Sequence, residues 1–427
     1  MTMNPYDVIV VGSGAGGAAL ARDLSLDGRK VLVIEKGRKE EKLGTFKDAL
    51  RYFDGNPTTK MPRKSREGHI IYRSFMAGGS TVVATGNMTR CLEEELGNVG
   101  IDLSEELQTA EHEMGVAPID PGLLSEKSRQ LQAAAKSIGY HLDPMPKAID
   151  AAKCRRCGKC SLGCAYGAKW TSRQYLQEAE DHGAELLLGA EVEKVLVENG
   201  HATGVRLHHP NPLTVTADTV VLAAGGLGTP VILKGSGIDQ AGDQLFADLL
   251  VTVYGLDPMK VQDSEPQMAL VDLEFHKKER FILSPFVQAA YPVRMIETGG
   301  RGAATSASSL LGIMVKIADE SVGQIYADGS YSKAPTDTDQ DILEQGIYRA
   351  KELLLAADVD PKSIIVSKVA GGHPGGTAAI DRVVDRHLMT GIKGLYVCDA
   401  SVLPRSPGMP PILTITALAK WLGKRLH

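Results

Sequence analysis

The sequence lacks an excess of positive charge, long apolar runs and an apolar leader. Its 427 residues carry 47 Lys and Arg against 52 Asp and Glu, a formal net charge of −5 at pH 7. Proteins that bind nucleic acid through its phosphates normally carry a basic surplus, so this balance excludes that class of partner. No stretch of about 18 apolar residues exists, which excludes a transmembrane helix. The polar start MTMNPYD runs directly into a strand and leaves no room for a signal peptide, so we expect a cytoplasmic protein.

Glycine and cysteine, by contrast, are unevenly concentrated. The 46 glycines cluster at residues 12–17, 78–86, 225–228, 299–302 and 371–376. Such clusters mark places where the backbone turns sharply or approaches a ligand closely. Four of the six cysteines lie between residues 154 and 164. In a cytoplasmic chain, that density indicates a metal or redox role before a disulfide.

The N-terminal segment has the pattern of a dinucleotide site. The run DVIVVG at 7–12 predicts a strand, GSGAGG at 12–17 a glycine turn, the following residues a helix, and KVLVIEKG a second strand that ends at Glu35. Gly12 permits the tight turn, Gly14 lets backbone N–H groups approach a pyrophosphate, and Gly17 lets the helix pack closely on the strand. Glu35 is placed to accept hydrogen bonds from a ribose. At this point both NAD and FAD fit the pattern.

Two later segments extend the same sheet. Residues 217–238 predict a buried strand, a glycine turn and a helix, and residues 391–404 predict another buried strand that ends at Asp399, followed by a final helix. We therefore expect one discontinuous domain built from the start, middle and end of the chain.

These segments resemble the glucose–methanol–choline (GMC) oxidoreductases, a family of FAD enzymes that oxidise alcohols. The matching pieces, in the family's order, are GSGAGGAALARDLS with Glu35, AGGSTVVATGNMTR at 77–90, AAGGLGTPVILKGSGI at 223–238, HPGGTAAI at 373–380, and VVDRHLMTGIKGLYVCDASVLP with the PPILTITALA tail. The resemblance implies a Rossmann-type α/β fold, bound FAD and alcohol oxidation.

The resemblance also implies which residues bind FAD. They are Gly12, Gly14, Ala15, Gly17, Glu35, Lys36, Gly78, Gly79, Ser80, Val83, Val192, Ala224, Gly225, Asp399, Ala400 and Thr414. Some members tether FAD through a histidine in the glycine loop. Val83 stands at that position here, and Ala84 stands where an asparagine is usual, so we expect non-covalent FAD.

His373, in GGHPGGT, matches the family's catalytic histidine. A histidine with a pKa near neutrality suits removal of the hydroxyl proton while hydride leaves for flavin N5. At the second catalytic position, where the family has an asparagine or histidine, the sequence has Pro410, which carries no side-chain donor.

The cysteine segment has the spacing C-x2-C-x2-C-x3-C. Its members are Cys154, Cys157, Cys160 and Cys164. Bacterial ferredoxins use this spacing, so a [4Fe–4S] cluster is our first interpretation, with zinc or structural thiols as alternatives. Cys164 is the favoured fourth ligand, and Cys91 and Cys398 are the alternatives.

We predict two domains. Residues 1–240 and 366–427 form the FAD-binding domain, with a cysteine insertion at about 150–168, and residues 241–365 form an α+β substrate domain with an antiparallel sheet that includes strands at 249–255 and 268–276. The predicted function is a dehydrogenase that uses His373 as base and passes electrons through the cluster to a protein carrier. The alternatives are a flavin and iron–sulfur reductase of a C=C or carbonyl group, or a non-catalytic electron-transfer subunit.

Overall fold

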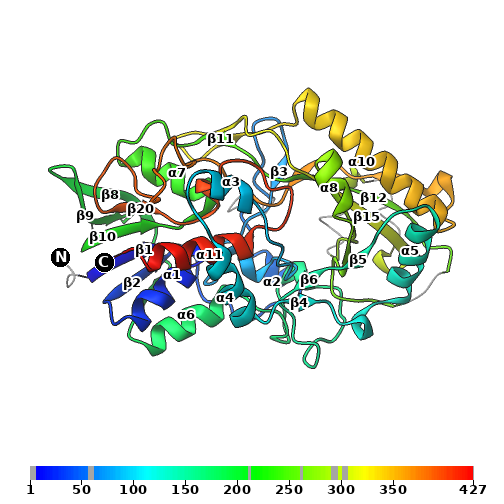
Figure 1. Cartoon of the computed structure of the whole chain (residues 1–427), viewed down its shortest axis with the longest axis horizontal. Coiled ribbons are helices and arrows are strands. Elements are labelled where there is room, and N and C mark those ends of the chain that lie inside the picture. The colour runs from blue at the N-terminus through cyan, green and yellow to red at the C-terminus, as the bar shows by residue number, and fades with distance from the viewer. Residues whose placement is uncertain are drawn as a thin grey trace.

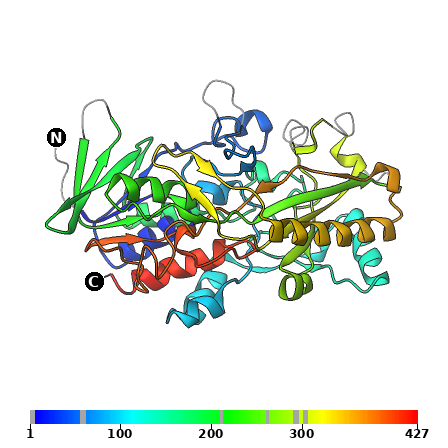
Figure 2. The same ribbon diagram turned by 90° about the horizontal axis from the view of Figure 1, so that it is seen from above.

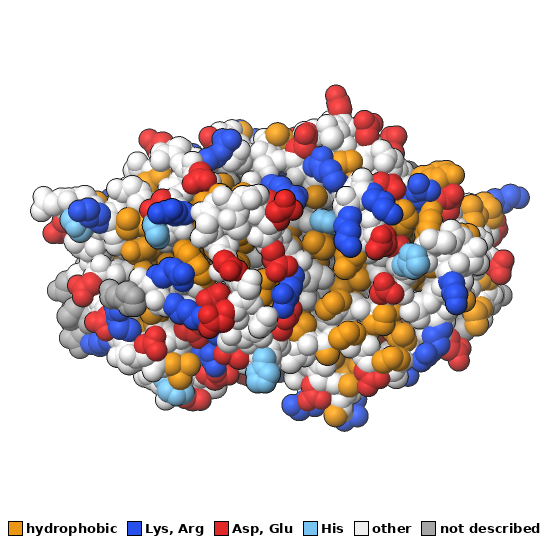
Figure 3. Space-filling view, in the orientation of Figure 1, with side chains coloured by type: hydrophobic (Ala, Val, Ile, Leu, Met, Phe, Trp, Pro, Cys, Tyr) orange, Lys and Arg blue, Asp and Glu red, His pale blue; other side chains and the backbone are white. Residues whose placement is uncertain are grey.

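The computed structural model describes residues 6–55, 62–209, 213–259, 263–289, 297–300 and 306–426. Two large sheets lie at opposite ends of an elongated molecule, as Figures 1 and 2 show. Over the face seen in Figure 3, Lys and Arg side chains are interspersed with Asp and Glu side chains. Within the described ranges, no helix has the length and apolar character needed to cross a membrane.

The first sheet has seven strands in the order β7-β2-β1-β10-β9-β8, with β20 also paired to β10. The pairs among β7, β2, β1, β10 and β20 are parallel, and β9 pairs antiparallel with both β10 and β8. The strands are β1 (Tyr6–Val11), β2 (Val31–Glu35), β7 (Glu185–Leu188), β8 (Val192–Glu198), β9 (His201–Leu207), β10 (Leu213–Leu222) and β20 (Leu395–Val397). The expected Rossmann-type sheet, with strands from the start, middle and end of the chain, is confirmed.

Helices cover this sheet and place their first turns at its carboxyl edge. Helix α1 (Ala15–Leu26) follows β1 directly and packs on α6 (Ser172–Asp181) and α11 (Ile412–Gly423), and α11 also contacts α4 (Ser104–Met114). Helix α7 (Gly225–Gly235) follows β10 in the same way. Because β1 and β10 are parallel neighbours, the glycine turns that follow them lie at the same edge of the sheet.

The second sheet is antiparallel apart from one pair. Its order is β14-β15-β12-β19-β3, with β18 also on β12, and only β19 and β3 run parallel. The strands are β3 (Ile70–Ile71), β12 (Leu249–Leu256), β14 (Phe281–Pro285), β15 (Leu310–Ile317), β18 (Ile365–Val366) and β19 (Ala370–Gly371). The expected antiparallel sheet is confirmed, and β3 and β19 join it from segments that the sequence assigned to the other domain.

Helix α10 (Asp337–Ala356) packs on β12, β14 and β15, and α5 (Glu126–Ser137) packs on α10. Figure 1 shows both helices at the end of the molecule formed by the second sheet. The shorter elements are α2 (Phe46–Ala49), α3 (Glu93–Asn98), β4 (Ala117–Pro118), β5 (Asp143–Pro144), β6 (Pro146–Lys147), β11 (Asp243–Leu245), β16 (Gly323–Ile325) and β17 (Tyr331–Ser332).

One expected strand is wrong over most of its length. Of residues 268–276, only Leu270–Val271 form a strand (β13), and helix α8 (Glu274–Glu279) starts within the range. Asp272 Oδ1 accepts a hydrogen bond from the Glu274 N–H at 2.9 Å. An aspartate that bonds the backbone two residues on favours a turn or helix start, and this local bond outweighs the alternating pattern.

Candidate functional site

A cavity of about 1060 Å³ is lined by residues of both sheets. Its walls are formed by the glycine turns after β1 and β10, the ends of β2 and β8, and one face of the second sheet. Of the residues that the sequence predicted to bind a cofactor, those that line this cavity are Gly12, Gly14, Ala15, Glu35, Lys36, Gly79, Ser80, Val83, Val192, Ala224, Gly225, Asp399 and Ala400. The structure therefore brings together residues from six separate segments of the chain.

The turn after β1 leaves space for a ligand at one glycine and none at the next. A Cβ placed on Gly14 would have no neighbour within 4 Å, whereas one on Gly16 would lie 1.9 Å from the carbonyl oxygen of Cys398. Gly12 has a φ of +104°, a conformation that favours glycine. The open side of Gly14, at the first turn of α1, fits a pyrophosphate held by backbone N–H groups.

Glu35 holds this turn in place from the end of β2. One carboxylate oxygen, Oε2, accepts hydrogen bonds from the Ser13 N–H at 3.0 Å and the Ser13 hydroxyl at 2.6 Å, and Oε1 accepts from the Gly37 N–H at 2.7 Å. The Ser13 hydroxyl oxygen in turn accepts from the Gly78 N–H at 3.1 Å. Glu35 thus ties the first glycine turn to the 78–80 loop while it lines the cavity.

Asp399 does the same for the turn after β10. Its carboxylate accepts hydrogen bonds from the Gly225 N–H at 2.7 Å and from the Thr229 hydroxyl at 2.5 Å, and also from the backbone and hydroxyl of Ser401. Burial raises the pKa of Asp399, and these hydrogen bonds oppose that shift. The carboxylate joins the ends of β10 and β20 at the cavity wall.

Three predicted cofactor residues lie behind the cavity wall. Gly17 packs against the first turn, where an added Cβ would lie 2.0 Å from the Gly12 carbonyl oxygen. Gly78, at a φ of +90°, starts the loop that contains Gly79 and Ser80. Thr414 donates a hydrogen bond to the Cys91 carbonyl at 3.0 Å from within α11.

His373 lines the same cavity and is paired with a buried carboxylate. Its Nδ1 lies 2.8 Å from Asp248 Oδ2, and the side chains of His373 and Asp248 are 21% and 0% exposed. Because Oδ2 accepts hydrogen bonds, the Nδ1–H is assigned to this contact, which leaves the lone pair on Nε2. Burial, and next the charge of Lys316, lower the pKa of His373, and Asp248 opposes the shift.

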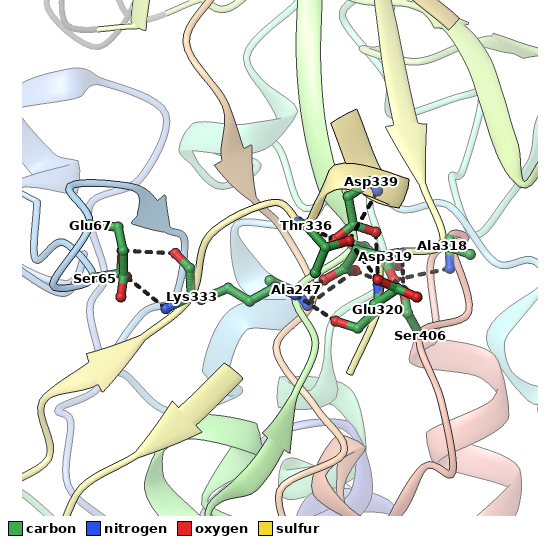
Figure 4. Close-up of polar contacts among 12 residues, drawn as sticks. Ser65, Glu67, Ala247, Ala318, Asp319, Glu320, Lys333, Thr336, Asp339 and Ser406 are labelled. Carbon is green, nitrogen blue, oxygen red and sulfur yellow. Dashed lines mark hydrogen bonds and ion pairs between the residues drawn. The ribbon is translucent and has the colours of Figure 1, made fainter. Parts of the chain in front are cut away.

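A buried polar network holds Asp248 from the opposite side. Asp248 Oδ1 accepts hydrogen bonds from the Ser406 hydroxyl at 2.6 Å and the Gly408 N–H at 3.0 Å. Ser406 also lies beside Asp319, which forms a 2.7 Å ion pair with the buried Lys333, as Figure 4 shows. The network fixes the carboxylate and, through it, the imidazole.

The sequence reasoning identified His373 but missed Asp248 and Lys316. Asp248 comes directly before β12, and Lys316 lies within the buried strand β15. A charged residue next to or inside an apolar strand is the signal that could have identified both, because a buried charge needs a partner or a function.

The expected [4Fe–4S] ligand set is not formed. The described ranges include Cys154, Cys157, Cys160 and Cys164, and within them no group of three or more His, Cys, Asp or Glu side chains is placed to hold a metal ion. Cys157 is exposed to solvent. Its neighbour Arg156, at a φ of +51°, forms an ion pair with Asp263 at 2.9 Å.

The two remaining cysteines are ordinary core thiols. Cys91 and Cys398 are both buried in the core around the first sheet. Burial raises the pKa of Cys91 to about 12 and raises the pKa of Cys398 as well. Within the described ranges neither belongs to a group of side chains placed to hold a metal ion, so neither supplies the missing ligand.

Comparison with known proteins agrees with this site. The family models described as GMC oxidoreductase match residues 6–250 and 331–419. An uncharacterized protein of Methanocaldococcus jannaschii is 30% identical, over 97% of this chain and 98% of that protein. Long-chain-alcohol oxidase FAO3 of Arabidopsis thaliana is 23% identical, over 98% of this chain and 67% of that protein.

Solved structures share the fold. The structure of pyridoxine 4-oxidase from Mesorbium loti superimposes with a TM-score of 0.75 and 16% identity, covering 99% of both chains. Formate oxidase of Aspergillus oryzae matches with a TM-score of 0.74, 16% identity, and coverage of 99% of this chain and 98% of that one. Together with the cofactor cavity, these matches show that the chain is an FAD-dependent oxidoreductase that belongs to the GMC oxidoreductase family.

Proposed function

We propose that this protein oxidises the CH–OH group of an alcohol to a carbonyl, with His373 as the base. The observation that carries the proposal is the 2.8 Å contact between His373 Nδ1 and Asp248 Oδ2 at the wall of the cofactor cavity. With Nδ1–H bound to Asp248, Nε2 is free to accept the hydroxyl proton. FAD, when bound, takes the hydride from the carbon that bears the hydroxyl.

The protonation state of His373 supports this role. Its pKa is lowered, chiefly by burial, so the imidazole is neutral at pH 7 and able to accept a proton. The buried Asp248 carboxylate stabilises the imidazolium that forms when the proton is taken. The imidazole is thus held in one orientation and made basic at a single nitrogen.

The cavity near His373 supports an alcohol with an apolar body. Met268, Phe286, Met314 and Leu250 line it, and they belong to one apolar cluster. Methionine side chains adapt to flexible apolar ligands. The name of the long-chain-alcohol oxidases among the relatives supports the same substrate class.

Non-covalent binding of FAD is part of the proposal. Val83 and Ala84 line the cavity, and neither side chain can form the covalent bond that a histidine forms with a flavin. Acid precipitation is expected to release all of the flavin into the supernatant. Flavin that stays with the precipitate would contradict non-covalent binding.

The [4Fe–4S] cluster and the protein electron carrier are not part of the proposed mechanism, because the four thiols are not placed as ligands. Stoichiometric iron and acid-labile sulfide in protein purified without oxygen would return the cluster and the electron carrier to the proposed mechanism. Reoxidation of the substrate-reduced enzyme by oxygen, compared with reoxidation by a one-electron dye, then identifies the acceptor.

The test of the function is reduction of the bound flavin by ethanol, hexanol and dodecanol without oxygen. We expect a rate that rises with chain length, and a loss of roughly 10²–10⁴-fold in His373→Ala with FAD still bound. His387→Ala, at an exposed histidine, is the matched control. An unchanged rate in His373→Ala would refute the proposal.

A further inference from the structure

The cavity lacks a hydrogen-bond donor at the position that the family resemblance assigns to a second catalytic side chain. Pro410 lines the cavity there, and proline has neither a side-chain donor nor a backbone N–H. Its carbonyl oxygen accepts a hydrogen bond from the Thr89 hydroxyl at 3.1 Å. An alcohol that loses its proton beside Pro410 therefore receives no hydrogen bond from it.

Lys316 reaches the same cavity from the second sheet. Along β15, Leu311, Ile313, Val315 and Ile317 face the core beneath the sheet, whereas Met314 and Lys316 face the cavity. This is the alternation of a strand, so the lysine belongs to the cavity face. Its Nζ lies 3.5 Å from His373 Nδ1, which places the ammonium beside the catalytic imidazole.

The ammonium of Lys316 differs from those of the other buried lysines. Lys333 and Lys420 each form ion pairs with carboxylates, and Lys147 and Lys169 each donate to at least three oxygen atoms. Lys316 is only 4% exposed, and among the described residues its Nζ has no oxygen acceptor.

The contact with His373 does not replace such an acceptor. The Nδ1–H of His373 is directed at Asp248, so Nδ1 has no lone pair to offer the ammonium. The charge of Asp248 favours the ammonium form of Lys316, but no hydrogen bond or ion pair joins the two side chains. Burying a cation without a hydrogen-bonded anion is unfavourable, and an apolar side chain would fill the same volume at lower free energy. The position of Lys316 is therefore explained by a ligand rather than by stability.

We propose that Lys316 binds the substrate oxygen as that oxygen becomes negatively charged, in place of the donor that Pro410 lacks. The inference rests on the proposed function. In the step, the O–H bond breaks and its proton goes to His373 Nε2, while the C–H bond breaks and its electron pair goes as hydride to FAD, the oxidant. The ammonium keeps its protons and stabilises the developing alkoxide until the carbonyl forms.

The first test measures binding of an anionic oxygen without turnover. Acetate is titrated into the oxidised, FAD-loaded enzyme, and the change in flavin absorbance gives its dissociation constant. We expect Lys316→Met to weaken acetate binding at least tenfold and Lys316→Arg, which keeps the charge, to retain most of it. Lys278→Met, at an exposed lysine, is the control.

The second test measures the reaction. We expect Lys316→Met to lower kcat by roughly 10²–10³-fold, as removal of one oxyanion donor does, with Lys316→Arg partly restoring it. Flavin content and thermal unfolding show that each variant is folded. If Lys316→Met does not fold, kcat and acetate binding are compared between Lys316→Arg and Lys316→Gln. Only Lys316→Arg keeps the charge, so only this variant is expected to retain them.

The outcomes separate this inference from the proposed function. Unchanged acetate binding and unchanged kcat in Lys316→Met overturn the inference and leave alcohol oxidation standing. A wild-type enzyme that binds acetate through Lys316 but oxidises no alcohol refutes the function and supports an anion site. A wild-type enzyme that binds acetate no better than Lys316→Met also overturns the inference.

Discussion

Asp248 Oδ2 lies 2.8 Å from His373 Nδ1, and the backbone of Asp248 has a strained conformation. Asp248 has a φ of +46° and is completely buried. A residue other than glycine in this region costs about 1–3 kcal/mol and persists where its surroundings fix it. The hydrogen bonds from Ser406 and Gly408 provide that constraint and direct the second oxygen at the imidazole.

The first prediction concerns the orientation of His373. In Asp248→Asn, the amide cannot accept hydrogen bonds at both ends, so either the imidazole or the Ser406 and Gly408 donors lose their partner. We expect kcat to fall roughly 10³–10⁴-fold with FAD retained. Stopped-flow reduction of the flavin measures this loss. Asp243→Asn, at an exposed aspartate, should react as the wild type does.

The second prediction concerns the acid limb of the pH profile. Burial first, and the Lys316 ammonium second, lower the pKa of His373 below its usual 6.5, while the Asp248 carboxylate opposes them. Because the proposed base is the neutral imidazole, kcat/KM is expected to rise with pH through a pKa below 6.5 and then to level off.

Removal of the Lys316 charge should move that limb. Lys316→Met removes one of the two effects that lower the pKa of His373, so the limb shifts to higher pH, whereas Lys316→Arg leaves it near the wild-type position. Measurement of kcat/KM between pH 5 and 8 decides this. A limb that stays in place in Lys316→Met would show that the ammonium does not act on His373.

The third prediction concerns stability. Burial lowers the pKa of Lys316 from 10.5 to about 8. Between those two values the unfolded chain holds a proton that the folded protein lacks, so folding stability from this group rises with pH. At pH 7 the buried charge therefore destabilises the fold by up to about 3 kcal/mol.

Lys316→Met is consequently expected to raise the free energy of unfolding of the FAD-free protein at pH 7, although it lowers activity. Urea unfolding at pH 7 and at pH 10 measures the effect. The increase in the free energy of unfolding relative to the wild type should be smaller at pH 10 than at pH 7. A Lys316→Met variant less stable than the wild type at pH 7 would contradict the prediction.

The fourth prediction separates cofactor binding from packing in the first glycine turn. A Cβ at Gly14 meets no protein atom within 4 Å, so Gly14→Ala should fold normally and lower FAD affinity at least tenfold by filling ligand space. A Cβ at Gly16 lies 1.9 Å from the Cys398 carbonyl oxygen, so Gly16→Ala should destabilise the FAD-free protein by about 2 kcal/mol or more. Thermal unfolding and FAD titration of both variants test the contrast.

Much of the cofactor site could be predicted from the sequence because its geometry is local. A buried strand, a glycine turn and a helix follow one another within residues 6–26, and an acidic residue ends the next strand at Glu35. The backbone conformation that only glycine adopts easily, and the regular path from strand to helix, are properties of neighbouring residues. The same logic located the turn after β10 and the strand end at Asp399.

The surroundings of the proposed base were decided by the tertiary structure. Asp248, Lys316 and His373 come from three distant parts of the chain, and only the pairing of β12 with β15 and β19 brings them together. The cysteine spacing matched a ferredoxin pattern, yet the fold leaves Cys157 exposed and forms no group of metal-ligating side chains within the described ranges. Residue spacing determines local backbone geometry. The distances between groups far apart in the chain, and how deeply each group is buried, depend on how the sheets pack. The packing therefore determines which charged groups come into contact.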